Sequence, residues 1–145
     1  MVGSVQWIDK NPLITTAHPL FYSSRMISII VPVDPIPQPR PRFGSGKVWQ
    51  PKRILDYKDK IRMMAMDAMR GRKPFEKPVD VTIHLYRKFA PTSRSYGDFD
   101  NLAKAICDAL NGILYRDDSQ IIKCVVEKHR DKNFPRVEIY AESRE

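Results

Sequence analysis

The sequence contains few of the residues on which several common functional sites depend. Of its 145 residues only two are cysteines, Cys107 and Cys124, and their spacing is not that of a structural zinc site. Its six glycines form no loop of the kind that cradles phosphates in nucleotide-binding enzymes. The sequence shows no convincing Ser-His-Asp or Cys-His arrangement, no transmembrane-length hydrophobic run and no secretory signal pattern. We therefore expect a reduced, cytoplasmic protein that uses neither a membrane nor a small-molecule cofactor.

What the chain has in excess is positive charge. Its 25 lysines and arginines outnumber 17 aspartates and glutamates, which leaves a formal net charge of +8. A basic surface attracts a polyanion such as nucleic acid and gains free energy by releasing counterions. A basic domain without such a partner is the common alternative. The length fits one globular domain with a core of its own.

Four aspartates flank one predicted helix. Asp98 and Asp100 precede it, and Asp117 and Asp118 follow it. One of the first two is expected to cap the helix, because an aspartate there accepts hydrogen bonds from the first free amides. Capping needs a single acid, however, and crowded carboxylates raise each other's pKa unless a cation lies among them. We therefore favour a site for Mg²⁺, or Mn²⁺ in its place, over capping alone.

The helix between these acids is predicted from an apolar stripe at helical spacing. An EF-hand loop that would begin at Asp98 is excluded, because Ala103 occupies the position where that loop needs glycine. Lys104 lies one helical turn after Asp100, so its ammonium group reaches the space in front of that carboxylate. The stripe consists of Leu102, Ala105, Ile106, Ala109 and Leu110, followed by Ile113 and Leu114.

The remaining chain predicts a mixed α/β domain over residues 26–145, preceded by a weakly ordered extension over residues 1–25. The expected order is β-α-β-α-β-β, an α+β fold with helices packed on a mixed sheet. The segment 130–135 is expected to join the last two strands as a hairpin. His84 falls on the outward face of its strand, where a lone histidine is typical of a surface residue. The predicted strands cover residues 26–33, 79–87, 121–128 and 136–141, and the first helix covers 51–70.

A proline-rich, basic segment over residues 35–47 is a candidate DNA-contacting loop. Alternating prolines favour an extended conformation, and the aromatic residues Phe43 and Trp49 are interleaved with positive charges. A proline-rich connector that happens to be basic is an equally good interpretation. The candidate DNA-binding residues are Arg40, Arg42, Lys47, Lys52, Arg53 and Arg94.

The residues around the aspartates resemble the core motif of the RusA family of Holliday junction resolvases, found in bacteria and phages. Looser similarity extends over residues 26–141. The resemblance implies a RusA-like fold and a homodimer that resolves four-way DNA junctions by symmetrical nicks, in recombination and repair, in a bacterial or phage-infected cell. The motif reads Asp98-x-Asp100-Asn101-Leu102-x-Lys104-Ala105-x-x-Asp108-Ala109-Leu110, then Leu114-x-x-Asp117-Asp118-x-Gln120-Ile121-Ile122.

The resemblance also implies roles for individual residues. Asp98, Asp100 and Asp118 would bind Mg²⁺ and be essential for cleavage, Asp117 would be a supporting acid, and Lys104 would be the catalytic lysine. Asp108 matches a family aspartate, and we expect it to orient Lys104 through a salt bridge.

The chain departs from the family in having Tyr96-Gly97 where arginines often precede the first aspartate. Phosphate contacts would then come from Arg94, Arg87 or Lys88, and the preferred branched substrate stays open. The main alternative is a non-catalytic branched-DNA-binding protein whose acids cap a helix and pair with lysines. A nuclease requires that Asp98, Asp100 and Asp118 lie close enough to share an ion.

Overall fold

A computed structural model describes residues 25–39, 42–44, 47–49 and 51–144. The predicted extension lies outside these residues except for Arg25, and Arg40 lies outside them as well. In chain order the elements are β1 (Met26–Val31), β2 (Arg42–Gly44), β3 (Lys47–Trp49), α1 (Lys52–Met69), β4 (Val79–Arg87), the 3₁₀ turn η3 (Arg94–Tyr96), α2 (Phe99–Ala109), the 3₁₀ turn η4 (Asp118–Gln120), β5 (Ile121–Arg130) and β6 (Arg136–Ser143).

Four strands form one mixed sheet in the order β1-β6-β4-β5. β4 pairs in parallel with β5 and antiparallel with β6, which in turn pairs antiparallel with β1. The parallel pair requires a crossover connection, and α2 supplies it. Because α2 runs back between β4 and β5, its N-terminus follows the end of β4 and its C-terminus precedes the start of β5.

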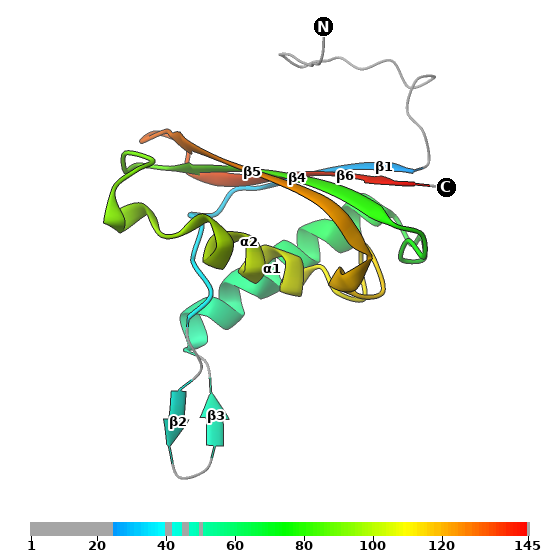
Figure 1. Ribbon diagram of the computed structural model, residues 1–145, viewed down its shortest axis with the longest axis horizontal. Coiled ribbons are helices and arrows are strands. Elements are labelled where there is room, and N and C mark those ends of the chain that lie inside the picture. Colours follow the sequence, from blue (N-terminus) through cyan, green and yellow to red (C-terminus); the bar gives the residue numbers. More distant parts are fainter. Residues whose placement is uncertain (1–24, 40–41, 45–46, 50, 145) are drawn as a thin grey trace, which may run out of the picture.

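Both helices cover the same face of the sheet (Figure 1). α1 buries a stripe at helical spacing, which consists of Ile54, Tyr57, Ile61, Ala65 and Met69. β4 alternates buried and half-buried residues, as a strand with one face on the core should. All seven residues of the stripe predicted around α2 are buried, although the helix itself ends at Ala109.

Arg62 of α1 holds the two helices together at the end of α2. Its guanidinium donates to the carbonyl oxygens of Ala109 at 2.8 Å and Asn111 at 3.2 Å. These acceptors belong to the last turn of α2 and the turn after it, where carbonyls lack helical partners and attract a cation.

The predicted α+β class is confirmed, and the β-α-β-α-β-β order holds for the main sheet and its helices. Two details differ. Residues 42–49 contain a short antiparallel hairpin, β2–β3, where an extended loop was expected. The predicted hairpin between the last two strands is wrong, because β4 lies between β5 and β6.

Candidate active site

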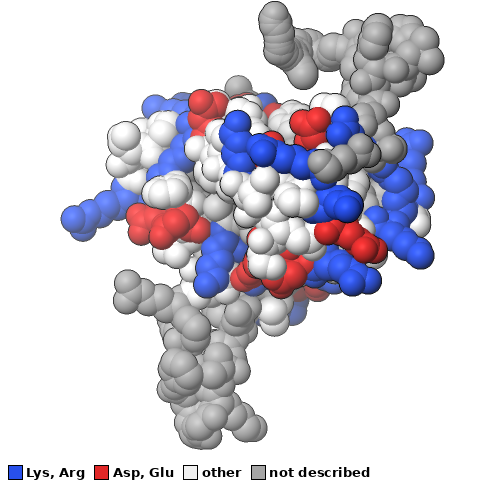
Figure 2. All heavy atoms as spheres, turned by 45° about the vertical axis from the view of Figure 1, so that its right-hand side comes forward, with Lys and Arg blue, Asp and Glu red and all other residues white. Residues whose placement is uncertain are grey.

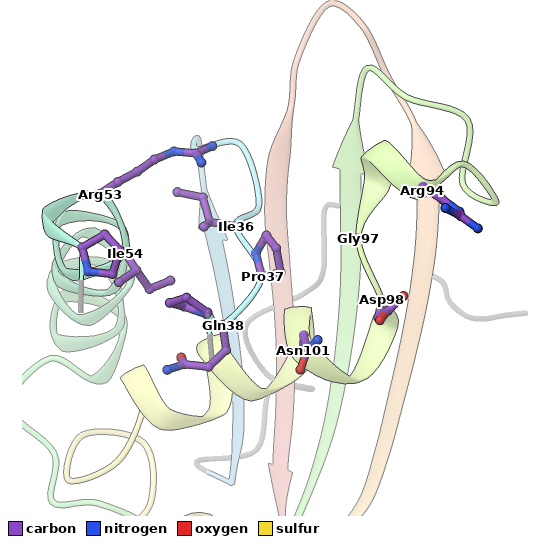
Figure 3. Close-up of a pocket in the computed structure, with 11 residues that line it drawn as sticks. Ile36, Pro37, Gln38, Arg53, Ile54, Arg94, Gly97, Asp98 and Asn101 are labelled. Carbon is purple, nitrogen blue, oxygen red and sulfur yellow. The ribbon is translucent and has the colours of Figure 1, made fainter. Parts of the chain in front are cut away.

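A pocket of about 430 Å³ lies beside the N-terminus of α2. It is lined by the proline-rich segment 36–39, the start of α1 and the residues that lead into α2. Figure 3 shows Arg53 on one side of the pocket and Arg94 with Asp98 on the other, with Ile36, Pro37 and Gln38 between them. Two predicted DNA-binding arginines and one predicted metal ligand therefore line the same recess.

Asp98 occupies the cap position of α2 without acting as a cap through its side chain. Its backbone carbonyl accepts the first helical bond from Leu102 at 3.0 Å, but its carboxylate makes no capping hydrogen bond. Asp100, in the first turn, accepts a hydrogen bond from the Asn101 amide at 2.9 Å. Both aspartates are exposed. Carboxylate oxygens at this helix N-terminus are therefore available to a cation.

Arg87 positions the loop between β4 and α2, which ends at Asp98. This side chain is buried, and it donates to the carbonyl oxygens of Tyr96 at 2.6 Å and Ser95 at 3.3 Å. It also makes two hydrogen bonds of 3.1 Å to the carboxylate of Asp34. Arg87 thus joins the end of β4 to the residues before Asp98 and to the proline-rich segment. It is not free to contact phosphate, which removes one of the three side chains proposed for that role.

Tyr96 provides a second anchor for the same loop. Its hydroxyl lies 2.8 Å from the carbonyl oxygens of Leu85 and His129 and accepts a hydrogen bond from the His129 amide at 3.2 Å. Burial raises the pKa of this hydroxyl to about 12. The next residue, Gly97, has φ +100°, a backbone conformation that residues with a Cβ rarely adopt. The backbone at Asp98 is therefore positioned by buried contacts.

The second acidic pair is built differently. Asp117 accepts a hydrogen bond from the Ser119 amide at 2.9 Å, and hydrogen bonding to the side chain and then the backbone of Ser119 lowers the pKa of its carboxyl. Gln120 accepts from the amides of Arg116 and Asp117 and donates to carbonyl oxygens of residues 75 and 77. The acidic turn is therefore fastened to the segment before β4.

Asp118 belongs with Asp108 at the C-terminal end of α2. Partial burial raises the pKa of Asp118, and the adjacent carboxyl of Asp108 and the charge of Asp117 raise it further. Asp108 makes its ion pair with Lys58 of α1 at 3.9 Å. The expected salt bridge between Asp108 and Lys104 is therefore replaced by one with Lys58, which reaches Asp108 from the neighbouring helix.

One protomer does not bring the two acidic groups together. Ten residues separate Asp98 from Asp108, which corresponds to about 15 Å along a helix, and Asp118 lies at the Asp108 end. Among the described residues, the group of three potential ligands whose atoms lie within 4.8 Å of one another is His84, Glu127 and His129, not a set of aspartates. A metal site shared by Asp98, Asp100 and Asp118 therefore stays a prediction, and α2 lies between the two acidic groups that would form it.

The predicted DNA-binding residues have different surroundings. Arg53 and Arg94 are exposed and line the pocket. Lys52 pairs with Asp56 at 2.7 Å on the surface of α1. On the face shown in Figure 2, acidic side chains form small groups separated by lysines and arginines. The candidates Arg42 and Lys47 are the first residues of β2 and β3.

The sequence did not predict the positioning roles of four residues: Arg87, which was expected to contact phosphate, Tyr96, Gln120 and Lys58. Gln120 belongs to the motif and Tyr96 precedes it by two residues, so their positions in the sequence could have indicated a role at the site. Arg87 and Lys58 carried no local signal, because their partners lie on other elements.

The chain is similar to known proteins. The chain is 29% identical over 129 residues to the uncharacterized protein YqaN of Bacillus subtilis (strain 168), an alignment that covers 73% of this chain and 88% of YqaN. None of the described helices is long and apolar enough to cross a membrane. Residues 32–142 match the family described as Endodeoxyribonuclease RusA. This range begins just after β1 and includes both acidic groups, the pocket, β4, β5 and all of β6 except its last residue. The chain therefore belongs to the RusA endodeoxyribonuclease family.

Proposed function

We propose that this protein is a divalent-metal-dependent endonuclease that resolves four-way DNA junctions by paired nicks. Family membership supports nuclease activity. The observation that carries the proposal is the pocket at the start of α2, where Asp98, free of capping hydrogen bonds, lies with Arg53 and Arg94. The two arginines would bind phosphates, while the carboxylates would hold the ion that the backbone cleavage needs.

The donor set fits a hard, oxygen-preferring ion such as Mg²⁺. Asp98, Asp100 and Asp118 are the ligands we propose, with Asp117 in support and Mn²⁺ as an alternative ion. When bound, such an ion polarises the phosphodiester and lowers the pKa of a bound water. Lys104, exposed on α2, would neutralise negative charge that develops on the phosphate oxygens.

Because Asp118 lies far from Asp98 and Asp100 within one chain, we propose that a homodimer completes each site. Two copies of α2 packed antiparallel about a two-fold axis would place the N-terminus of one beside the C-terminus of the other. Phe99, Ala103 and Cys107 follow one another at four-residue spacing on α2. Phe99, a large aromatic residue, is 62% exposed at the N-terminus of α2. This surface supports a helix-to-helix interface.

A junction-cleavage experiment tests the activity. A synthetic four-way junction is incubated with the parent or with Asp100→Asn, with and without Mg²⁺. We expect paired nicks from the parent with Mg²⁺ only. The variant should not cleave but should bind the junction equally well or better, because a negative charge facing phosphate has been removed. Junction binding by the parent without cleavage under any divalent ion would instead identify a non-catalytic branched-DNA-binding protein.

A complementation experiment tests the two-protomer site separately. Asp100→Asn and Asp118→Asn are each inactive under the proposal. A mixed dimer, however, keeps one site in which the intact Asp98, Asp100 and Asp118 come from different chains. Random exchange should restore about a quarter of the parent's active sites, seen as single nicks. The double variant Asp100→Asn/Asp118→Asn, mixed with itself, is the control. No recovery in an active nuclease would show that each site lies within one protomer.

A further inference from the structure

A second group of potential metal ligands lies on the other face of the sheet, away from the aspartates. His84 is on β4, and Glu127 and His129 are on the edge strand β5. The parallel register places His84 opposite Glu127 and Tyr86 opposite His129. Because side chains alternate along a strand, Glu127 and His129 share the face that His84 occupies on the next strand. The three side chains therefore converge, although Glu127 comes 43 positions after His84 in the sequence.

The three ligand atoms form a nearly regular triangle. His84 Nδ1 and His129 Nε2 are 2.9 Å apart, and each is 3.3 Å from Oε1 of Glu127. Zinc binds imidazole nitrogen and carboxylate oxygen at about 2.0–2.2 Å, which makes the ligand-to-ligand edge of a tetrahedral site about 3.3–3.5 Å. Two edges already have this length. If the two nitrogens moved apart by about a further 0.5 Å, the third edge would have this length as well.

Surrounding contacts hold the two rings in place. The ring of His129 stacks on Tyr86 with centroids 4.6 Å apart and on His84 at 5.1 Å. Tyr140 lies edge-on to His84 at 6.0 Å. The two imidazoles are about one-third exposed or less, at 27% and 33%, so water and ions reach them without unfolding the strands.

Two further charged residues act on His129, Glu138 and Arg136, and they form an ion pair with each other. Glu138 accepts hydrogen bonds from Arg136 at 2.6 Å and from the Tyr140 hydroxyl at 2.9 Å. Arg136 also pairs with Asp131 at 3.0 Å. Its positive charge is therefore balanced by two carboxylates, whereas the carboxylate of Glu127 lies 3.3 Å from both histidines.

We propose that His84, Glu127 and His129 form a binding site for a divalent transition-metal ion, with Zn²⁺ as the best match. Two imidazoles and one carboxylate are ligands that zinc accepts readily and Mg²⁺ does not. On binding, the imidazole that donates the facing N–H would carry its proton on its other ring nitrogen instead, so that both facing nitrogens offer lone pairs to the ion, and water would fill the remaining position. The ion cross-links β4 to the sheet's edge strand, next to the His129 backbone that anchors Tyr96.

Zinc titration calorimetry on metal-stripped protein tests the site, with Mg²⁺ present in excess to occupy oxygen-only sites. We expect one Zn²⁺ per chain and a higher thermal unfolding midpoint when it is bound. His84→Gln, His129→Gln and Glu127→Gln should each lower zinc affinity by at least about tenfold. His18→Gln, which removes the chain's remaining histidine, is the matched control and should bind as the parent does.

Two further measurements separate this site from its competitors. The Co²⁺-loaded protein should show the visible bands of a tetrahedral nitrogen–oxygen site without a thiolate charge-transfer band, so that Cys107 and Cys124 are excluded as ligands. Far-UV circular dichroism checks that each variant is folded. Of the three substitutions, Glu127→Gln should disturb folding least, because the Glu127 side chain is 60% exposed. Unchanged zinc affinity in a folded Glu127→Gln variant together with a folded histidine variant, or a thiolate band in the cobalt spectrum, would overturn the proposal.

Discussion

Replacing Arg87 with methionine should cost both stability and cleavage, because this one buried side chain supports the loop that carries Asp98. Methionine keeps much of the length and the apolar contacts of the arginine stem. It removes all four hydrogen bonds, two to Asp34 and two to the carbonyl oxygens of Ser95 and Tyr96.

The size of the effect follows from those contacts. Leaving the buried Tyr96 carbonyl without a donor costs about 1–3 kcal/mol. The pair with Asp34 adds about 1 kcal/mol or less, because the Asp34 side chain is 46% exposed and solvent screens the interaction. Loss of the contacts with the rings of Phe89 and Tyr96, at 4.8 and 5.7 Å, adds about 0.5–1 kcal/mol. The sum is about 3 kcal/mol, or a decrease of about 10 °C in the unfolding midpoint.

Urea unfolding followed by circular dichroism measures the stability, and junction cleavage under saturating DNA measures the rate. We expect the Arg87→Met rate to fall by about tenfold or more at a temperature where the variant is folded, since small displacements of reacting groups are costly. Junction affinity should change little. Arg94→Met is the matched control: an exposed arginine whose loss should leave stability within about 0.5 kcal/mol and weaken DNA binding. A folded Arg87→Met variant with parental stability and parental cleavage would refute the positioning role.

Three more predictions concern other parts of the site. Tyr96→Phe should lose about 1–3 kcal/mol in urea unfolding. Because the folded pKa of this hydroxyl is raised to about 12, its contribution should persist below pH 10 and disappear as pH rises toward 12, which alkaline unfolding of parent and variant would reveal. Asp118→Asn should abolish cleavage yet raise the melting midpoint at pH 7 by about 2 °C. The raised pKa of Asp118 means that the folded state is penalised as pH rises through it, and a gain that is equally large at pH 3 would contradict this sign. Under the proposed function, junction affinity should fall steeply with salt, because phosphate neutralisation by side chains such as Arg53 and Arg94 would dominate binding; a flat titration would contradict the phosphate-binding role proposed for the pocket.

Local patterns in the sequence were sufficient for the elements that carry the site. The alternation over residues 79–87 corresponds to β4 at both ends, and the apolar stripe after Asp98 is buried throughout. These agree because burial of one face imposes a period of 2 on a strand and 3.6 on a helix, and each period is visible within about ten residues. The family motif likewise lies in one continuous stretch.

Contacts between distant segments were decided by the tertiary structure alone. β6 enters the sheet between β1 and β4, so the last two strands never pair, and α2 holds Asp118 away from Asp98. The burial of Arg87 beneath the loop and the meeting of His84 with His129 depend on strand order and register in the same way. A periodic pattern records which face of a segment is buried but not which segment covers it, because many partners offer the same apolar surface. The sequence therefore determined the elements and the acids, and only the packed chain determined which of them meet.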